Sequence, residues 1–98
     1  MASENLWGAL AKGDQVARER LLTENLNLVH HVARQLSKAL AAPADDDELV
    51  SCGTIGLMNA LDAFEQARGL AFSTFAVPRI RGAILDELRR QDHVPRSI

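Results

Sequence analysis

The feature that most constrains this 98-residue chain is the spacing of apolar residues between positions 25 and 40. The apolar positions of this stretch are Val29, Val32, Ala33, Leu36 and Leu40. They follow an i, i+3, i+4, i+7, i+11 pattern, which places them along one face of a helix. A face of this kind must pack against other elements, so the stretch predicts a long amphipathic helix lying on an apolar core.

Helix signals recur along the rest of the chain. Alanine and leucine are frequent, β-branched residues are few and tyrosine is absent, a composition that favours helix over strand. Asp14 is a plausible N-cap for the second helix, and Gly69 marks the end of a loop. The expected helices span residues 3–11, 15–23, 25–40, 45–64 and 73–91. With 47% hydrophobic residues, the chain predicts one all-α domain, a compact bundle of about four to six helices.

Two helices contain residues that interrupt an ordinary helix. Gly53 and Gly56 lie inside the fourth helix, where each costs up to about 1 kcal/mol relative to alanine. We therefore expect them to allow close approach of another helix, or to mark a short break. Pro78 falls about one turn inside the last helix and should bend it or delay its start.

Charge is distributed unevenly along the chain. Residues 1–67 carry five Lys or Arg and ten Asp or Glu, a local charge of −5, whereas residues 68–98 carry six Arg and three acidic residues, a local charge of +3. This asymmetry indicates a basic face near the C-terminal end. Arginine suits planar, bidentate or stacked contacts better than lysine does.

The sequence gives no sign of enzyme chemistry, a metal or a cofactor. His30 and His31 are adjacent, so on a helix they point about 100° apart and do not form an i, i+4 metal pair. The acidic run 45–48 lacks the spacing of a calcium loop and is better explained by the positive end of a helix dipole. No phosphate-binding loop or nucleophile motif occurs. We therefore expect a protein that is not an enzyme.

Cysteine usage and hydropathy bear on location. Cys52 is the single cysteine, so it forms no internal disulfide, which fits a reducing compartment. We interpret it as an ordinary buried small residue. No signal peptide or membrane-length apolar run is present, and we expect a cytoplasmic protein without a membrane partner.

The fourth helix has two faces to assign. We interpret Leu49, Ile55, Leu57 and Leu61 as core residues of a buried helix. Ser51, Thr54, Met58 and Asp62 form a separate stripe at i, i+3, i+7 and i+11. This stripe would suit docking against a helix of another protein.

The last helix combines aromatic and basic residues. Phe72 is expected in the core, whereas Phe75 fits either core packing or a platform on which an unstacked base could lie. The arginines at 79, 81, 89 and 90 could be a solvated face paired with Asp86 and Glu87. Because a second Pro-Arg pair at 95–96 extends the basic surface past the helix, phosphate and base contacts are a reasonable alternative.

Taken together, these motifs resemble the conserved second domain of bacterial sigma factors of the sigma-70 type. The family pattern DDL-x-x-x-G-x-IGL-x-x-A-x-x-x-F, followed by F-S-T-Y-A, falls on DDELVSCGTIGLMNALDAF and FSTFA. The segment RIRGAILDELRRQDHVPRS is most similar to the flagellar and sporulation branch, which is sigma-28-like, and LWGALAKGDQVARERLLTENLNLVHHVARQL matches the N-terminal part of that branch. The resemblance covers almost the whole chain and implies a single domain over 1–98. Its implied parts are an N-terminal helical part (1–24), polymerase-binding helices (25–69), and a promoter −10 recognition and melting helix with the start of a linker (70–98).

The resemblance also implies partners and site residues. It implies binding to the coiled-coil clamp helices of the RNA polymerase β′ subunit and to the promoter −10 element, especially its non-template strand. The resemblance places Glu48, Ser51, Cys52, Thr54 and Met58 against polymerase. Asp62, the last residue of the stripe, is assigned to the same contact. The residues assigned to DNA are Phe75, Arg79, Arg81, Glu87, Arg89, Arg90, His93 and Arg96.

Several positions depart from the family pattern. The stacking tyrosine of the family falls on Phe75, which keeps the ring and loses the hydroxyl. Pro78 and Arg79 stand where primary sigma factors have two tryptophans, and His93 stands where this branch commonly has tryptophan. Positions 51 and 52 more often carry Gln or Glu in the family.

Two other functions remain open from the residues. The first is a helical interaction module whose main partner is an anti-sigma factor, which keeps the docking stripe and leaves the arginines solvated or in protein contacts. The second is a helix-turn-helix repressor, for which the chain shows no short turn before a recognition helix.

Overall fold

The structure is a computed structural model that describes residues 2–40, 46–65 and 68–93. The helices are α1 (Ala2–Ala11), α2 (Gln15–Glu24), α3 (Leu26–Leu40), α4 (Asp46–Ala63) and α5 (Phe72–His93). No strand occurs in the described ranges. The expected all-α class is confirmed, and each helix lies within a few residues of its expected bounds.

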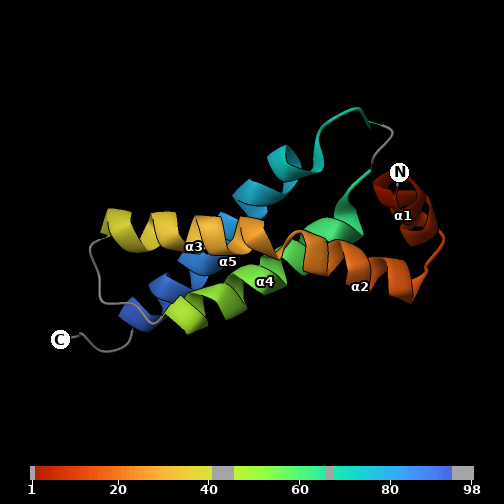
Figure 1. Ribbon diagram of the computed structural model, residues 1–98. Helices are drawn as coiled ribbons and strands as arrows, with labels where there is room; N and C mark the ends of the chain where they lie inside the picture. Colours follow the sequence, from red (N-terminus) through yellow and green to blue (C-terminus); the bar gives the residue numbers. More distant parts are fainter. Residues whose placement is uncertain (1, 41–45, 66–67, 94–98) are drawn as a thin grey trace.

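The first three helices follow one another through short connections. Gly13 has a φ of 88° at the end of α1, a left-handed conformation that glycine adopts without strain. The Asp14 carboxylate then accepts hydrogen bonds from the backbone N–H groups of Val16 at 2.9 Å and Ala17 at 3.2 Å, so the expected N-cap is confirmed. Asn25 alone separates α2 from α3, and the two helices run nearly end to end (Figure 1).

The core lies where α3, α4 and α5 meet, with α4 and α5 in the most extensive contact. The largest fully buried side chains are Leu21, Val29, Val32, Leu49, Leu57, Leu61, Ile80 and Ile84. They come from α2, α3, α4 and α5. In the stripe predicted on α3, Val29, Val32 and Ala33 are buried and Leu36 packs against the core, whereas the side chain of Leu40 lies outside what the structure describes. α3 and α4 thereby form a support on which α5 is fixed.

One core prediction was wrong. Ile55 is 58% exposed, whereas Leu49, Leu57 and Leu61 are buried as expected. The reason is that Gly53 and Gly56 supply part of the buried surface of α4. Small residues therefore occupy core-facing positions, and the isoleucine between them points to the opposite side of the helix.

The two glycines let α4 approach its neighbours closely, and they do not break the helix. A Cβ at Gly53 would lie 2.8 Å from Cγ1 of Val29, and a Cβ at Gly56 would lie 2.8 Å from the carbonyl oxygen of Arg79. α4 is continuous through both positions. Of the two roles expected for these glycines, close packing is the one observed.

Aromatic side chains join α1 to the other end of the bundle. Ring centroids are 4.9 Å apart for Trp7 and Phe64, 5.0 Å for Trp7 and Phe72, and 5.1 Å for Phe64 and Phe72. Phe72 is half-buried in this cluster and packs against the edge of the core. α5 begins at Phe72 and continues through Pro78, so the proline does not delay the start of the helix.

Candidate functional site

The solvent-facing side of α4 carries every residue that the sequence assigned to polymerase. Glu48, Ser51 and Asp62 are exposed, and Cys52, Thr54 and Met58 are half-buried. The opposite side of the helix is buried through Leu49, Gly53, Gly56, Leu57 and Ala60. The six predicted residues therefore share one broad face, which we call the α4 face.

Ile55 is the member of the α4 face that the sequence interpretation missed. It follows Ser51 by four residues and precedes Met58 by three, spacings that make residues neighbours on a helix surface. Its 58% exposure places a second large apolar side chain beside Met58, near the middle of a face whose other members are polar or small. The spacing from Ser51 and Met58 was the signal that could have identified it.

Asp62, at the end of the α4 face, also has a structural role. Its two carboxylate oxygens accept hydrogen bonds from Nε and Nη2 of Arg18 on α2, at 3.0 and 3.2 Å. This hydrogen bond raises the pKa of the Arg18 guanidinium. The pair fixes α2 against α4, so Asp62 is less free to meet a partner than Ser51 is.

An open groove of about 380 Å³ connects the α4 face with α5. Its lining residues are Cys52, Ile55, Asn59, Ala83, Asp86, Glu87 and Arg90. Partial burial raises the pKa of the Cys52 thiol, and the carboxylates of Glu87 and Glu48 raise it further. The thiol is therefore kept protonated, the opposite of what a nucleophilic cysteine needs.

The arginines of α5 differ in how they are held. Arg90 forms an ion pair with Glu87, and Arg89 forms one with Asp86 at 3.3 Å. Arg81 is exposed and forms no ion pair within the part of the chain that the structure describes. The pairing considered from the sequence is thus present for Arg89 and Arg90.

These arginines do not form a single row. Arg79 and Arg81 are two residues apart, which separates them by about 160° around the helix. Arg79 lies beside Phe75, one turn away, and Arg81 points to another side of α5. His93 ends α5 with its side chain outside what the structure describes, and Arg96 lies outside the described residues.

Phe75 packs at the edge of the core and also holds an arginine against its ring. Its side chain is half-buried, with the ring centroid 5.3 Å from that of Phe64 and packed at the edge of the core. The guanidinium carbon of Arg79 lies 3.7 Å from the centroid of the Phe75 ring. A hollow of about 220 Å³ adjoins this pair, and Arg68 and Leu70 form part of its wall.

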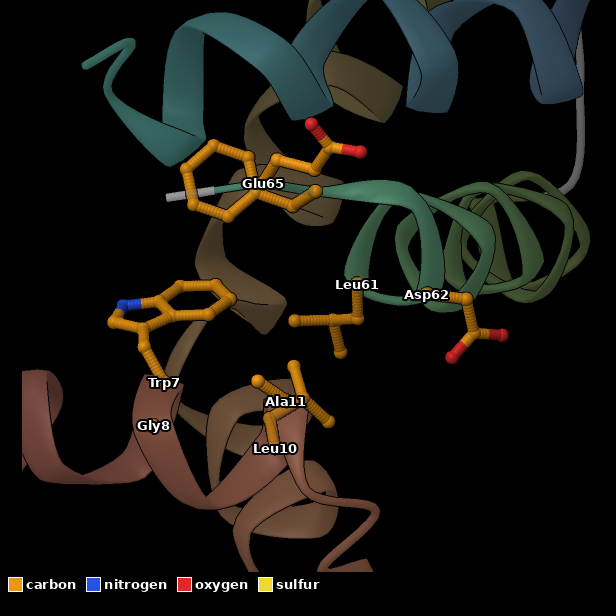
Figure 2. A pocket seen from close by; sticks show the side chains of 8 residues that line it. Trp7, Gly8, Leu10, Ala11, Leu61, Asp62 and Glu65 are labelled. Atoms are coloured by element: carbon orange, nitrogen blue, oxygen red, sulfur yellow. The ribbon is translucent and has the colours of Figure 1, made fainter. Parts of the chain in front are cut away.

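A second groove, of about 570 Å³, lies between α1 and the end of α4. Figure 2 shows Trp7 and Leu10 on the α1 side and Leu61 across from them. The acidic residues on its rim are paired, Asp62 with Arg18 and Glu65 with Arg68. Trp7 was missed by the sequence interpretation, because its partners lie far along the chain.

The described helices include none that is long and apolar enough to span a membrane. Within the same residues, no three His, Cys, Asp or Glu side chains gather in a way that could hold a metal ion.

Comparison with known proteins places this arrangement in one family. Residues 21–94 match the sequence pattern of sigma-70 region 2. The chain is 52% identical over 71 residues to RNA polymerase sigma factor FliA of Salmonella typhimurium and 51% identical over 71 residues to FliA of Escherichia coli K12; each match covers 72% of this chain and 30% of the relative. It is 39% identical over 84 residues to the RNA polymerase sigma-D factor of Bacillus subtilis, covering 86% of this chain and 33% of the relative.

The chain thus spans about a third of the length of these curated relatives. The match to region 2 includes α3, α4 and α5, the helices that build the core and carry the candidate residues. The chain belongs to the sigma-70 family of RNA polymerase sigma factors and, within that family, is sigma-28-like.

Proposed function

We propose that this chain is the sigma-factor part that binds the β′ clamp helices of RNA polymerase and recognises and opens the promoter −10 element. The α4 face would dock on the clamp helices and so present α5 to DNA. The arginines of α5 would hold phosphates while a base that has left the stack is captured near Phe75. The chain would make and break no bond itself, because polymerase performs the chemistry.

The observation that carries this proposal is the composition of the α4 face. Ile55 is exposed on this face, next to the half-buried Met58 and among the polar residues Ser51, Thr54 and Asn59. Contiguous apolar patches rimmed by polar residues mark protein-binding surfaces, and Ile55 and Met58, three residues apart, are neighbours on the helix surface. Met58, three residues further on, is half-buried and can adapt its flexible thioether to a partner helix.

Binding of the chain to a purified fragment that contains the β′ clamp helices tests the proposal. Met58→Ala should weaken capture of that fragment, and Thr54→Arg should abolish it, because a long charged side chain would stand in the contact. Gln35→Arg, at an exposed position of α3, is the matched control and should bind normally. Capture that survives both changes on α4 would overturn the docking role of this face.

A second function is favoured by the ion pairs along α5. Because Arg89 and Arg90 are neutralised by Asp86 and Glu87, they offer less free positive charge to phosphate than isolated arginines would. An anti-sigma factor could use the same α4 face as its main docking site. A chain that binds neither the clamp helices nor single-stranded promoter DNA, but binds a protein inhibitor, would favour this second function.

A further inference from the structure

The aromatic ring proposed to receive a base is covered by an arginine of its own helix. The guanidinium carbon of Arg79 lies 3.7 Å from the centroid of the Phe75 ring. A second contact fixes the arginine there, because Nη1 of Arg79 donates a hydrogen bond to the backbone carbonyl oxygen of Phe75 at 2.9 Å. The guanidinium is therefore held at both the ring and the backbone.

This contact leaves no room for a base on the covered face of the ring. A separation of 3.7 Å is ordinary van der Waals contact, so a stacked base and the guanidinium need the same space. Phe75 is also in contact with Phe64, at a centroid distance of 5.3 Å, which leaves it little freedom to turn away. A base can stack on the covered face only after Arg79 has moved.

The hollow beside Phe75 suits a single flat ring. Its volume is about 220 Å³, and its lining includes Phe64, Arg68, Leu70 and Arg79. Sites for drug-sized ligands begin at about 300 Å³, so this hollow is too small for most of them. Glu65 also lines the hollow and forms an ion pair with Arg68, so Arg79 is the wall cation without a carboxylate partner among the described residues. The rings of Phe64 and Phe75 beside this guanidinium match a nucleobase with its attached phosphate.

We propose that Arg79 is an intramolecular cap on Phe75, which competes with the incoming base for the ring face. This inference rests on the proposed function, in which Phe75 stacks an unpaired base. In the free chain, the guanidinium occupies the ring. When a base replaces it, the same cation is released at the rim of the hollow, where it can meet the phosphate of that nucleotide.

The cap should lower the base-dependent part of binding by a modest factor. An exposed cation–π contact shifts an equilibrium by about two- to fivefold. A site that is open for only a fraction of the time binds more weakly by that same fraction. Removing the guanidinium should therefore strengthen base stacking by about two- to fivefold, even though it also removes a positive charge.

Two probes of equal charge separate these effects. The first is a short oligodeoxyadenylate, and the second is an abasic oligodeoxynucleotide of the same length. Loss of a phosphate contact weakens binding of both oligonucleotides equally. The affinity for the oligodeoxyadenylate divided by the affinity for the abasic oligonucleotide therefore reports base stacking alone. For Arg79→Ala we expect this ratio to rise about two- to fivefold, measured with the 98-residue chain by fluorescence anisotropy. Arg79→Gln, which keeps much of the side-chain length, should raise it as well.

Controls distinguish failure of the cap from failure of the proposed function. Phe75→Ala should bring the ratio close to one in the chain with Arg79; a ratio that does not change would overturn the stacking role of Phe75 itself. Arg89→Ala, at an exposed arginine on the same helix, should lower both affinities and leave their ratio unaltered. If Phe75→Ala behaves as expected while Arg79→Ala leaves the ratio constant or lowers it, Arg79 is not a cap. A lower ratio would mean that Arg79 stacks on the bound base.

Discussion

Gly56 and Arg79 bring the backbones of α4 and α5 into direct contact. A Cβ atom at Gly56 would lie 2.8 Å from the carbonyl oxygen of Arg79 and 3.0 Å from Cα of Ile80. The helix proposed to bind polymerase thus sets the position of the helix proposed to bind DNA at the turn that carries Arg79. The Cβ atom of Ala83 lies at the same contact, also 3.0 Å from that position.

The first prediction concerns the substitution Gly56→Ala. Overpacking costs about 1–3 kcal/mol, and the higher helix propensity of alanine offsets up to about 1 kcal/mol of it. Because the obstructing atoms are backbone atoms of α5 and the Cβ atom of Ala83, none of which can move aside as a flexible side chain would, we expect the free energy of unfolding to fall by about 1–2 kcal/mol. Urea unfolding followed by circular dichroism measures this change.

Gly82→Ala is the matched control for that experiment. Gly82 lies inside α5, and a Cβ atom at this position would meet nothing within 4 Å. Alanine there should therefore leave stability unchanged or raise it by up to about 1 kcal/mol. Equal effects at Gly56 and Gly82 would show that the close approach does not constrain the helices.

The local features of the fold could be predicted from the sequence. Two of these features, the Asp14 cap and the apolar stripe of α3, depend on residues close together in the chain. The third, the tight packing at Gly53 and Gly56, depends on the fact that glycine has no side chain. Each of them has a direct physical signature in the sequence. These signals were enough to predict the helices and most of the core.

The features that the sequence did not predict are of two kinds. Some depend on contacts between side chains whose interaction no local pattern reveals, and others depend on which face of a helix is buried. Ile55 was assigned to the core because hydropathy favours burial of isoleucine, yet the glycines occupy the core-facing side. The contacts of Trp7 with Phe64 and Phe72 join residues more than fifty positions apart, which no local pattern reveals. Arg79 and Phe75 are spaced for contact at i, i+4, but each was considered as a separate DNA contact.

A second prediction follows from the exposure of Ile55. Because the side chain is already largely in solvent, Ile55→Arg should change the free energy of unfolding by less than about 0.5 kcal/mol. Binding to the β′ clamp-helix fragment should weaken by about tenfold or more, because a charged side chain would replace an apolar anchor near the centre of the contact. Val16→Arg, at a position of α2 that is 68% exposed, should affect neither quantity. An Ile55→Arg variant that binds normally would exclude Ile55 from the docking surface.

A third prediction concerns the reactivity of Cys52 as pH changes. Burial and the nearby carboxylates raise the pKa of this thiol, and only the thiolate reacts with iodoacetamide. The midpoint of the alkylation rate should therefore lie above about 8.5, the ordinary value for cysteine. Glu87→Gln should lower that midpoint, whereas Glu19→Gln on α2 should not. A midpoint below the ordinary value would mean that the thiol is activated.

The last prediction separates Arg81 from Arg89 by salt dependence. Each duplex phosphate contact contributes about −0.9 to the slope of log affinity against log salt concentration. Arg81 forms no ion pair among the described residues, so Arg81→Ala should flatten the slope by about that amount. Arg89 must first leave Asp86, so Arg89→Ala should flatten it less, and Asp86→Asn should make the slope steeper. Anisotropy titrations at several salt concentrations measure these slopes. Equal slopes for Arg81→Ala and Arg89→Ala would show that the ion pair of Arg89 with Asp86 does not limit phosphate binding.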